Sequence, residues 1–231
     1  MNVIELSNLT FRWPKQTENL LDIPSLTINQ GEKVFIKGPS GSGKSSLLSL
    51  LTGISQPTTG KINLLQQSFS HLESTQRDKF RADHIGYIFQ MFNLLPYLSV
   101  IDNVLLPCRF SARRRVQINN RLEAEAKRIL TQLHLPQRCL NRPISELSIG
   151  QQQRVAAARA IIGQPELLIA DEPTSALDHD NREAFIALLM KECEQAQTTL
   201  LFVSHDETLE SLFDRSIALN DINQAYKGSK Q

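Results

Sequence analysis

The sequence has few cysteines, few aromatic residues and no long apolar run. Its three cysteines, Cys108, Cys139 and Cys193, are scattered and odd in number, which argues against a disulfide framework or a cysteine metal site. No apolar run approaches the ~20 residues of a membrane span, and the N-terminus lacks the pattern of a signal peptide. We therefore expect a cytosolic protein with buried or unreactive thiols, unless a partner holds it at a membrane.

The chain also lacks an excess of charge of either sign. Lys and Arg number 25 against 24 Asp and Glu, so the formal net charge is +1. Such a balance gives no general electrostatic footprint for nucleic acid, and no nucleic-acid partner is expected. A chain of 231 residues can bury a substantial core as one domain that carries a subdomain.

The most informative motif is a glycine-rich loop between a strand pattern and a helix pattern. Its residues are Gly38, Pro39, Ser40, Gly41, Ser42, Gly43, Lys44 and Ser45. Residues 33–37 before it predict a short buried strand, and residues 46–51 after it predict a helix, with Ser46 at its start. This order of strand, loop and helix is typical of a loop that binds the phosphates of a nucleoside triphosphate.

Each residue type in this loop has a chemical reason. A side chain at Gly41 or Gly43 would block the approach of backbone amides to phosphate, Lys44 supplies a compact positive charge, and the Ser45 hydroxyl can ligate Mg²⁺. The N-terminus of the following helix adds a partial positive charge. A flexible linker of glycine and serine is the alternative, and it predicts neither the lysine nor the final serine.

The remainder of the chain alternates strand and helix patterns. The first thirty residues predict antiparallel strands; residues 61–65, 85–89, 166–171 and 199–203 predict further strands; residues 103–135 predict helix. The last two strands are almost continuously apolar, as in a buried parallel sheet. These patterns predict an α/β fold with an N-terminal antiparallel β subdomain and an inserted helical subdomain.

An acidic pair closes the predicted strand 166–171. Asp171 at a strand end is placed to hold Mg²⁺, and Glu172 is placed as the general base for an attacking water. The alternative for the pair is a solvated turn, and Pro173 does follow it. An acidic pair at the end of an apolar strand favours the functional interpretation.

Two further polar residues follow strand ends. His205 comes after the strand 199–203, where a neutral imidazole could hydrogen-bond a terminal phosphate; a structural histidine is the alternative. Gln90 follows the strand 85–89 and could reach Mg²⁺ or the water. Neither residue by itself is evidence of a nucleotide-binding site.

Residues 147–151, Leu-Ser-Ile-Gly-Gln, precede a helix pattern rich in Ala and Arg, and we call them the signature segment. The N-terminus of that helix, with Ser148, Gly150 and Gln151, is a second candidate anion site. One phosphate chain does not need two distant helix N-termini of one polypeptide. Two copies that each contribute one are therefore expected to enclose each nucleotide. An ordinary helix capped by Ser148 is the alternative.

Together these residues resemble the ATP-binding cassette family of transport ATPases over nearly the whole chain. The motifs that carry the resemblance are residues 38–45, Gln90, the signature segment, Asp171-Glu172, residues 175–178 and His205. The resemblance implies a P-loop cassette with a RecA-like core formed by residues 1–90 and 161–231, and a helical subdomain formed by residues 91–160. It also implies ATP and Mg²⁺ as ligands.

The resemblance implies a role for individual residues as well. Glu172 would be the catalytic base, His205 the phosphate switch and Asp178 a contact across the dimer. Trp13 would stack on adenine, and an aromatic packed beside Phe11 is its alternative. The implied partners are a second copy of the chain and a separately encoded membrane permease, which would hold the protein at the cytoplasmic face of the inner membrane. A soluble relative acting on DNA or ribosomes remains the alternative function.

Residues 85–96 are similar to one subgroup, which contains lipoprotein-release, macrolide-export and cell-division ATPases. Two features depart from its pattern: Ile149 stands where the family usually has glycine, and Ser175-Ala176 stands where the subgroup tends to have glycine and asparagine. A branched side chain at position 149 could alter closure of the dimer, so we expect slower ATP turnover than is typical.

Two surface features complete the predictions. The apolar residues between 91 and 97 are expected to form core of the helical subdomain, to line a groove for a helix of the membrane partner, or to do both. The run Arg113-Arg114-Arg115 predicts a solvated basic face rather than a lipid site.

Overall fold

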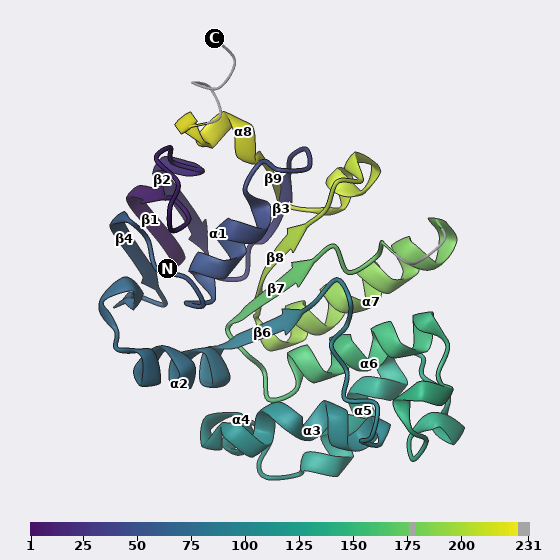
Figure 1. Ribbon diagram of the computed structural model, residues 1–231. Coiled ribbons are helices and arrows are strands. Elements are labelled where there is room, and N and C mark those ends of the chain that lie inside the picture. The colour runs from purple at the N-terminus through teal and green to yellow at the C-terminus, as the bar shows by residue number, and fades with distance from the viewer. Residues whose placement is uncertain (176–178, 226–231) are drawn as a thin grey trace. The chain divides into compact units, whose positions relative to one another are not determined.

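A computed structural model describes residues 1–175 and 179–225, which divide into two compact units (Figure 1). The first unit contains Met1–Arg81 and the described part of Leu201–Gln231, and the second contains Ala82–Leu200. The chain leaves the first unit within helix α2 (Ser74–His84) and returns to it within strand β8 (Thr199–Val203). Each unit is described by itself below.

The first unit holds an antiparallel sheet with the strand order β2-β1-β4-β5. Its strands are β1 (Asn2–Phe11), β2 (Leu21–Asn29), β4 (Thr59–Leu64) and β5 (Gln67–Ser68). The register places Leu6 opposite Leu26 on one side and opposite Ile62 on the other, and all three side chains are buried. Alternation of apolar and polar residues thus puts one face of the sheet on the core, as predicted.

The first unit also holds the strand and helix on either side of the glycine-rich loop. Strand β3 (Lys33–Lys37) pairs in parallel with β9 (Arg215–Ala218), and its central residues Val34, Phe35 and Ile36 are fully buried. Helix α1 (Lys44–Leu51) follows the loop, and the short helix α8 (Leu219–Ile222) follows β9. Strand β9 and α8 are not predicted from the sequence.

The second unit combines a parallel strand pair with helices. Strand β6 (Ile85–Ile88) pairs with β7 (Leu167–Asp171). Its helices are α3 (Val100–Phe110), α4 (Ala112–Gln117), α5 (Leu122–Gln132), α6 (Ile149–Ile161) and α7 (His179–Ala196). The predicted helical stretch 103–135 is thus three helices. Ser111 ends α3 and caps α4, since its side chain accepts a hydrogen bond from the Arg114 amide.

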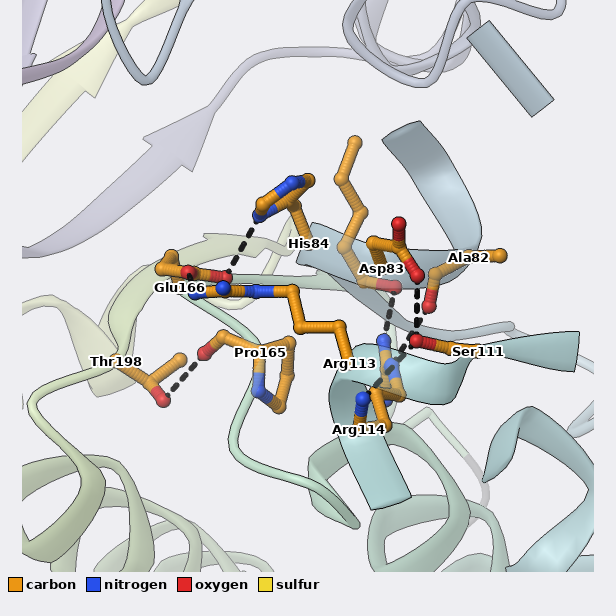
Figure 2. Close-up of polar contacts among 10 residues, drawn as sticks. Ala82, Asp83, His84, Ser111, Arg113, Arg114, Pro165, Glu166 and Thr198 are labelled. Carbon is orange, nitrogen blue, oxygen red and sulfur yellow. Dashed lines mark hydrogen bonds and ion pairs between the residues drawn. The ribbon is translucent and has the colours of Figure 1, made fainter. Parts of the chain in front are cut away.

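The three consecutive arginines do not form a solvated face, so that prediction is wrong for Arg114. Its side chain is 2% exposed, and Arg113 instead pairs with Glu166 (Figure 2). Arg115 donates to the carbonyl of Cys108. A basic run in sequence therefore divides between the interior and the surface, because successive residues of a helix point in different directions.

These elements confirm the predicted α/β class with an antiparallel sheet, parallel strand pairs and helices. The predicted division into residues 1–90, 91–160 and 161–231 stays a prediction. All three cysteines are free and buried. Among the described residues, no helix is both long enough and apolar enough to span a bilayer.

Candidate functional site

The glycine-rich loop of the first unit has the backbone that its sequence predicts. Gly41 and Gly43 have φ values of 79° and 99°, a left-handed region that other residues rarely adopt. A Cβ atom added to Gly43 would lie 2.6 Å from a methyl carbon of Leu21. The left-handed conformation therefore favours glycine at position 43, and a side chain there would also displace the end of the Leu21 side chain.

The same loop carries polar groups suited to an anion. The Ser42 side chain is 2% exposed, and its hydroxyl has no hydrogen-bond partner among the described residues. The Lys44 ammonium donates to the carbonyls of Gly38, at 2.6 Å, and Pro39, at 3.1 Å. No side chain caps α1, whose N-cap residue is Gly43. A buried hydroxyl without a partner, a lysine folded over the loop and an uncapped helix N-terminus fit a phosphate chain.

His205 lies beside the strand that enters this loop. The amide of Ser204, after the end of β8, donates to the carbonyl of Ile36 in β3 at 3.2 Å. Ser204 is buried and also accepts a hydrogen bond from the Asp206 amide, whereas His205 itself is exposed. Two strands far apart in sequence thus bring the histidine and the glycine-rich loop to one edge of the first unit.

Trp13 lies in the loop after β1 with part of its surface accessible. Its side chain is 40% exposed and makes an edge-to-face contact with the buried ring of Phe11, with centroids 5.0 Å apart. The sequence left stacking on adenine and packing on Phe11 as alternatives. The structure shows the packing, and the exposed fraction leaves ring surface for a ligand.

The second unit brings Gln90 and the acidic pair to one sheet edge. In the parallel pairing of β6 and β7, Ile88 lies opposite Ala170. Gln90 comes two residues after Ile88, and Glu172 comes two residues after Ala170. Both residues therefore lie at the same end of the parallel strand pair. Glu172 is half-buried and has a φ of 45°. A left-handed glutamate is strained, and such strain is often found at functional sites.

Tyr87 is a site residue that the sequence did not reveal. Its hydroxyl donates to the Asp171 carboxylate at 3.2 Å, and its ring contacts that of Phe89, with centroids 4.3 Å apart. Burial, together with the charge and hydrogen bond of Asp171, raises the pKa of Tyr87, so it stays a neutral donor at physiological pH. The one available signal was a polar group in the otherwise apolar strand 85–89.

The signature segment forms a capped helix start in the second unit. The Ser148 side chain accepts from the Gln151 amide at 3.3 Å, and the Gln151 side chain accepts from the Ser148 amide at 3.0 Å. This capping box confirms that Ser148 is a helix cap. Ile149 is 57% exposed, so its branched side chain lies on the surface. Binding of a nucleotide by Ser148, Gly150 and Gln151 stays a prediction.

The predicted site residues thus form two groups. Residues 38–46, Trp13 and His205 belong to the first unit; Gln90, Asp171, Glu172 and the signature segment belong to the second. Asp178 lies outside the described residues. The roles of these residues around one nucleotide therefore stay predictions.

Comparison with known proteins places these motifs in a family. The model of the family described as "ABC transporter" matches residues 21–175. The lipoprotein-releasing system ATP-binding protein LolD of Psychrobacter arcticus is 40% identical over 200 residues, which cover 85% of each chain. A macrolide export ATP-binding/permease protein, MacB of Burkholderia thailandensis, is 38% identical, and the match covers 95% of this chain and 33% of that protein.

Solved structures agree with the sequence relatives. The dimeric structure of MJ0796, an ABC transporter cassette, superposes with a TM-score of 0.81 at 35% identity and covers 93% of each chain. MJ0796 of Methanocaldococcus jannaschii is also 37% identical to this chain in sequence. A second MJ0796 structure, described as a post-hydrolysis state bound to ADP and Pi, superposes with a TM-score of 0.82. The chain therefore belongs to the ABC transporter family and is an ATP-binding ATPase of that family.

Proposed function

We propose that this chain is the ATPase subunit of a transport complex, and that two copies enclose ATP and Mg²⁺ to move a separately encoded membrane permease. The permease would hold the chain at the cytoplasmic face of the inner membrane. Export, lipoprotein release and transmission of force across the membrane are the processes that this proposal includes.

The observation that carries the proposal is the presence of two helix N-termini suited to phosphate. Helix α1 in the first unit and α6 in the second both begin without an acidic residue in the first turn, so neither positive dipole end is neutralised from within its helix. One phosphate chain does not need two helix N-termini from distant parts of one polypeptide. Two copies arranged head to tail would use both, and the related MJ0796 cassettes are described as dimers.

Within this proposal, each polar group has a task in ATP hydrolysis. Lys44 and the loop amides bind the outer phosphates, and Glu172 accepts a proton from the attacking water. His205 orients the terminal phosphate, and Trp13 stacks on the base. When bound, Mg²⁺ would neutralise charge that develops on the phosphates.

The candidate Mg²⁺ ligands are few, and they suit this ion. Ser45, Gln90 and Asp171 would hold it together with phosphate oxygens. Among residues 1–175 and 179–225, no group of three or more His, Cys, Asp or Glu side chains forms a metal cage. Mg²⁺ usually binds through one or two carboxylates plus substrate phosphates, so a sparse ligand set is what this chemistry needs.

The membrane partner is supported by the relatives and by exposed apolar residues of the second unit. Met91 is 81% exposed and Tyr97 is 77% exposed, whereas Phe92 between them is 8% exposed. The apolar stretch after Gln90 thus combines core with exposed surface, as the two open interpretations allowed. The exposed residues are the proposed contact with the permease.

The experiment that tests the proposal is hydrolysis and dimerisation of the purified chain. Glu172→Gln is expected to bind ATP, lose hydrolysis and accumulate as a dimer by size-exclusion chromatography with light scattering, whereas the unmodified chain with ADP stays monomeric. Glu123→Gln, which removes a surface carboxylate of α5 that pairs with Lys127, is the matched control and should hydrolyse ATP normally.

Failure to dimerise with ATP and Mg²⁺, even with hydrolysis disabled and the co-purified permease present, would show that the proposed interface is wrong. Normal turnover by Glu172→Gln would show that another group is the base. Co-purification with the membrane protein would identify the permease, and its topology would separate export from lipoprotein release.

A further inference from the structure

A buried arginine of the signature helix holds the loop that follows Gln90. Arg159 lies in the last turn of α6 and is 8% exposed. Its guanidinium donates to the carbonyl of Asn93 at 2.7 Å and to that of Phe92 at 2.5 Å. Two parallel donors on adjacent carbonyls match the planar fork of arginine. A lysine ammonium has three donors but lacks this fixed fork and stands on a shorter side chain, so we expect lysine at this position to hold the two carbonyls less firmly.

The two carbonyls belong to a turn that needs support. Phe92 and Asn93 have φ values of 59° and 48°, and two successive left-handed residues other than glycine are unfavourable. The turn has backbone hydrogen bonds from the Phe92 amide to Phe89 and from the Asn93 amide to Met91. Gln90 lies inside this turn. The conformation of its backbone therefore depends on whatever stabilises residues 89–93.

The two hydrogen bonds to the turn explain why an arginine is buried at position 159. Desolvation lowers the pKa of the guanidinium, which means that burial disfavours its charge. The hydrogen-bond partners that the structure shows for Arg159 in the described part of the chain are carbonyls rather than a carboxylate. A residue that served only to fill this space would be apolar, since an apolar side chain avoids the cost of desolvating a charge.

A second buried arginine, Arg114, which is labelled in Figure 2, holds the other end of the same segment. Arg114 donates to the carbonyl of Ile85, the first residue of β6, at 2.6 Å and to that of Ile162, just after α6, at 2.8 Å. A Cβ atom added to Gly163 would lie 2.4 Å from the Cβ of Arg114, so the fit is close. Both ends of the segment from β6 to the turn are thus tied to the C-terminal end of α6.

We propose that Arg159 is a positioning residue that fixes the Gln90 turn to the signature helix, so that the two move as one body. This inference rests on the proposed function, because Gln90 would act on Mg²⁺ or the attacking water. If a partner displaced the exposed residue Met91, the turn would not bend. The turn and α6 would move together, so that Ser148, at the opposite end of α6, would be displaced as well.

The test is Arg159→Lys in the full chain, with Arg154→Lys as the matched control. Arg154 lies on the same helix and donates to the carbonyl of His134, away from the turn. Hydrogen exchange of the Phe92 and Asn93 amides is measured first, because it needs neither ATP nor activity. We expect it to be faster in Arg159→Lys by about tenfold or more, as for a local opening, and unchanged in Arg154→Lys.

The second measurement is ATPase rate against Mg²⁺ concentration. Arg159→Lys should require about tenfold more Mg²⁺ for half-maximal rate, as when a supporting partner of a metal ligand is lost, with binding of ATP in the absence of Mg²⁺ unchanged. If the lysine variant does not fold, both measurements are made on Arg159→Gln, whose side chain is neutral and keeps one donor group.

Three outcomes decide the inference. Unchanged exchange at Phe92 and Asn93 would overturn it, and so would an equal rise across the whole second unit, which would indicate a merely structural role. Faster exchange confined to the turn, with a raised Mg²⁺ requirement, would support it. Absence of hydrolysis by the unmodified chain would overturn the proposed function instead. The exchange measurement would still test whether Arg159 holds the turn.

Discussion

The Tyr87 hydroxyl donates a hydrogen bond to the Asp171 carboxylate across two neighbouring strands, at 3.2 Å. Asp171 is the residue proposed to hold Mg²⁺, so this bond orients a candidate metal ligand. Its importance follows from the position of the carboxylate at the sheet edge, where the strand pairing fixes the backbone but not the direction of the side chain.

Removal of this hydroxyl should weaken the response to Mg²⁺. Tyr87→Phe keeps the ring contact with Phe89 and loses only the donor, so we expect roughly a tenfold higher Mg²⁺ concentration for half-maximal ATPase rate. Binding of ATP without Mg²⁺ should not change. Tyr97→Phe, at an exposed tyrosine of the same unit, is the control. Identical Mg²⁺ titrations for the two variants would exclude a role for Tyr87.

Loss of the loop lysine should weaken ATP binding by about tenfold or more. Lys44→Ala removes the fixed cation that lies over the Gly38 and Pro39 carbonyls, and a charged hydrogen bond to phosphate contributes about 1.5 to 3 kcal/mol. The measurement is equilibrium binding of a fluorescent ATP analogue. Lys37→Met is the control, because Lys37 precedes the loop and pairs with Glu210. Retained affinity in Lys44→Ala would show that the phosphates bind elsewhere.

Truncation of Trp13 should weaken ATP binding moderately. Stacking of a base on an aromatic ring contributes about 1 to 3 kcal/mol, so Trp13→Ala should raise the dissociation constant for ATP between roughly fivefold and a hundredfold. Trp13→Phe keeps an aromatic face and should lose less. If inorganic triphosphate, which has no base, loses affinity equally, the effect comes from the packing on Phe11 and not from stacking.

Replacement of Ile149 by glycine should raise the rate of ATP turnover. The side chain is 57% exposed at the first position of α6, where a branched group would meet the partner copy in the proposed dimer. Steady-state hydrolysis by Ile149→Gly is compared with that by Ile149→Leu, which keeps the bulk. A rate in Ile149→Gly no higher than in the unmodified chain would refute an effect of this residue on closure.

Acid should destabilise the second unit through Glu166. Burial raises the pKa of this carboxyl, but its hydrogen bonds with His84 and Arg113 outweigh that effect and leave the pKa below its usual value of 4.5 (Figure 2). A lowered pKa in the folded state adds stability above the unfolded pKa, and this stability is lost as pH falls through the folded pKa.

The corresponding measurement is thermal unfolding of Glu166→Gln and the unmodified chain between pH 7 and pH 3. The difference in stability should be largest near neutral pH and should shrink below about pH 4.5. Glu123→Gln, on the surface of α5, is the control. A difference that stays constant over this range would mean that the charge of Glu166 does not stabilise the fold.

Local patterns allowed most of the fold to be predicted. The apolar runs at 33–37 and 199–203 became β3 and β8 with the same bounds, because continuous apolar residues between turn signals leave few alternatives to a buried strand. The sequence pattern predicts that the helix begins after residue 151, but α6 begins at Ile149, since Ser148 is its cap. Strand β9 was missed: its four residues include Arg215 and Ser216, and it pairs with a strand far away in sequence.

The residue types of the site could be predicted, but the groups that support them could not. A glycine-rich loop and an acidic strand end have patterns that span a few neighbouring residues. Tyr87, Arg114 and Arg159 act through bonds to residues 29 to 84 positions away, and no spacing rule connects such partners. The burial of Arg114 could not be predicted from its neighbours either, because Arg113 and Arg115 are charged and a run of three arginines predicts a solvated face.

The left-handed backbone of Glu172 sets the stability of the fold against the catalytic role proposed for this residue. Glycine adopts such a φ of 45° without cost, so folding alone would favour glycine there. The chain instead keeps a carboxylate and accepts a less stable turn at the end of β7. Selection for thermal stability alone would therefore tend to replace Glu172 with glycine, and under the proposed function such a variant would be more stable but would no longer hydrolyse ATP.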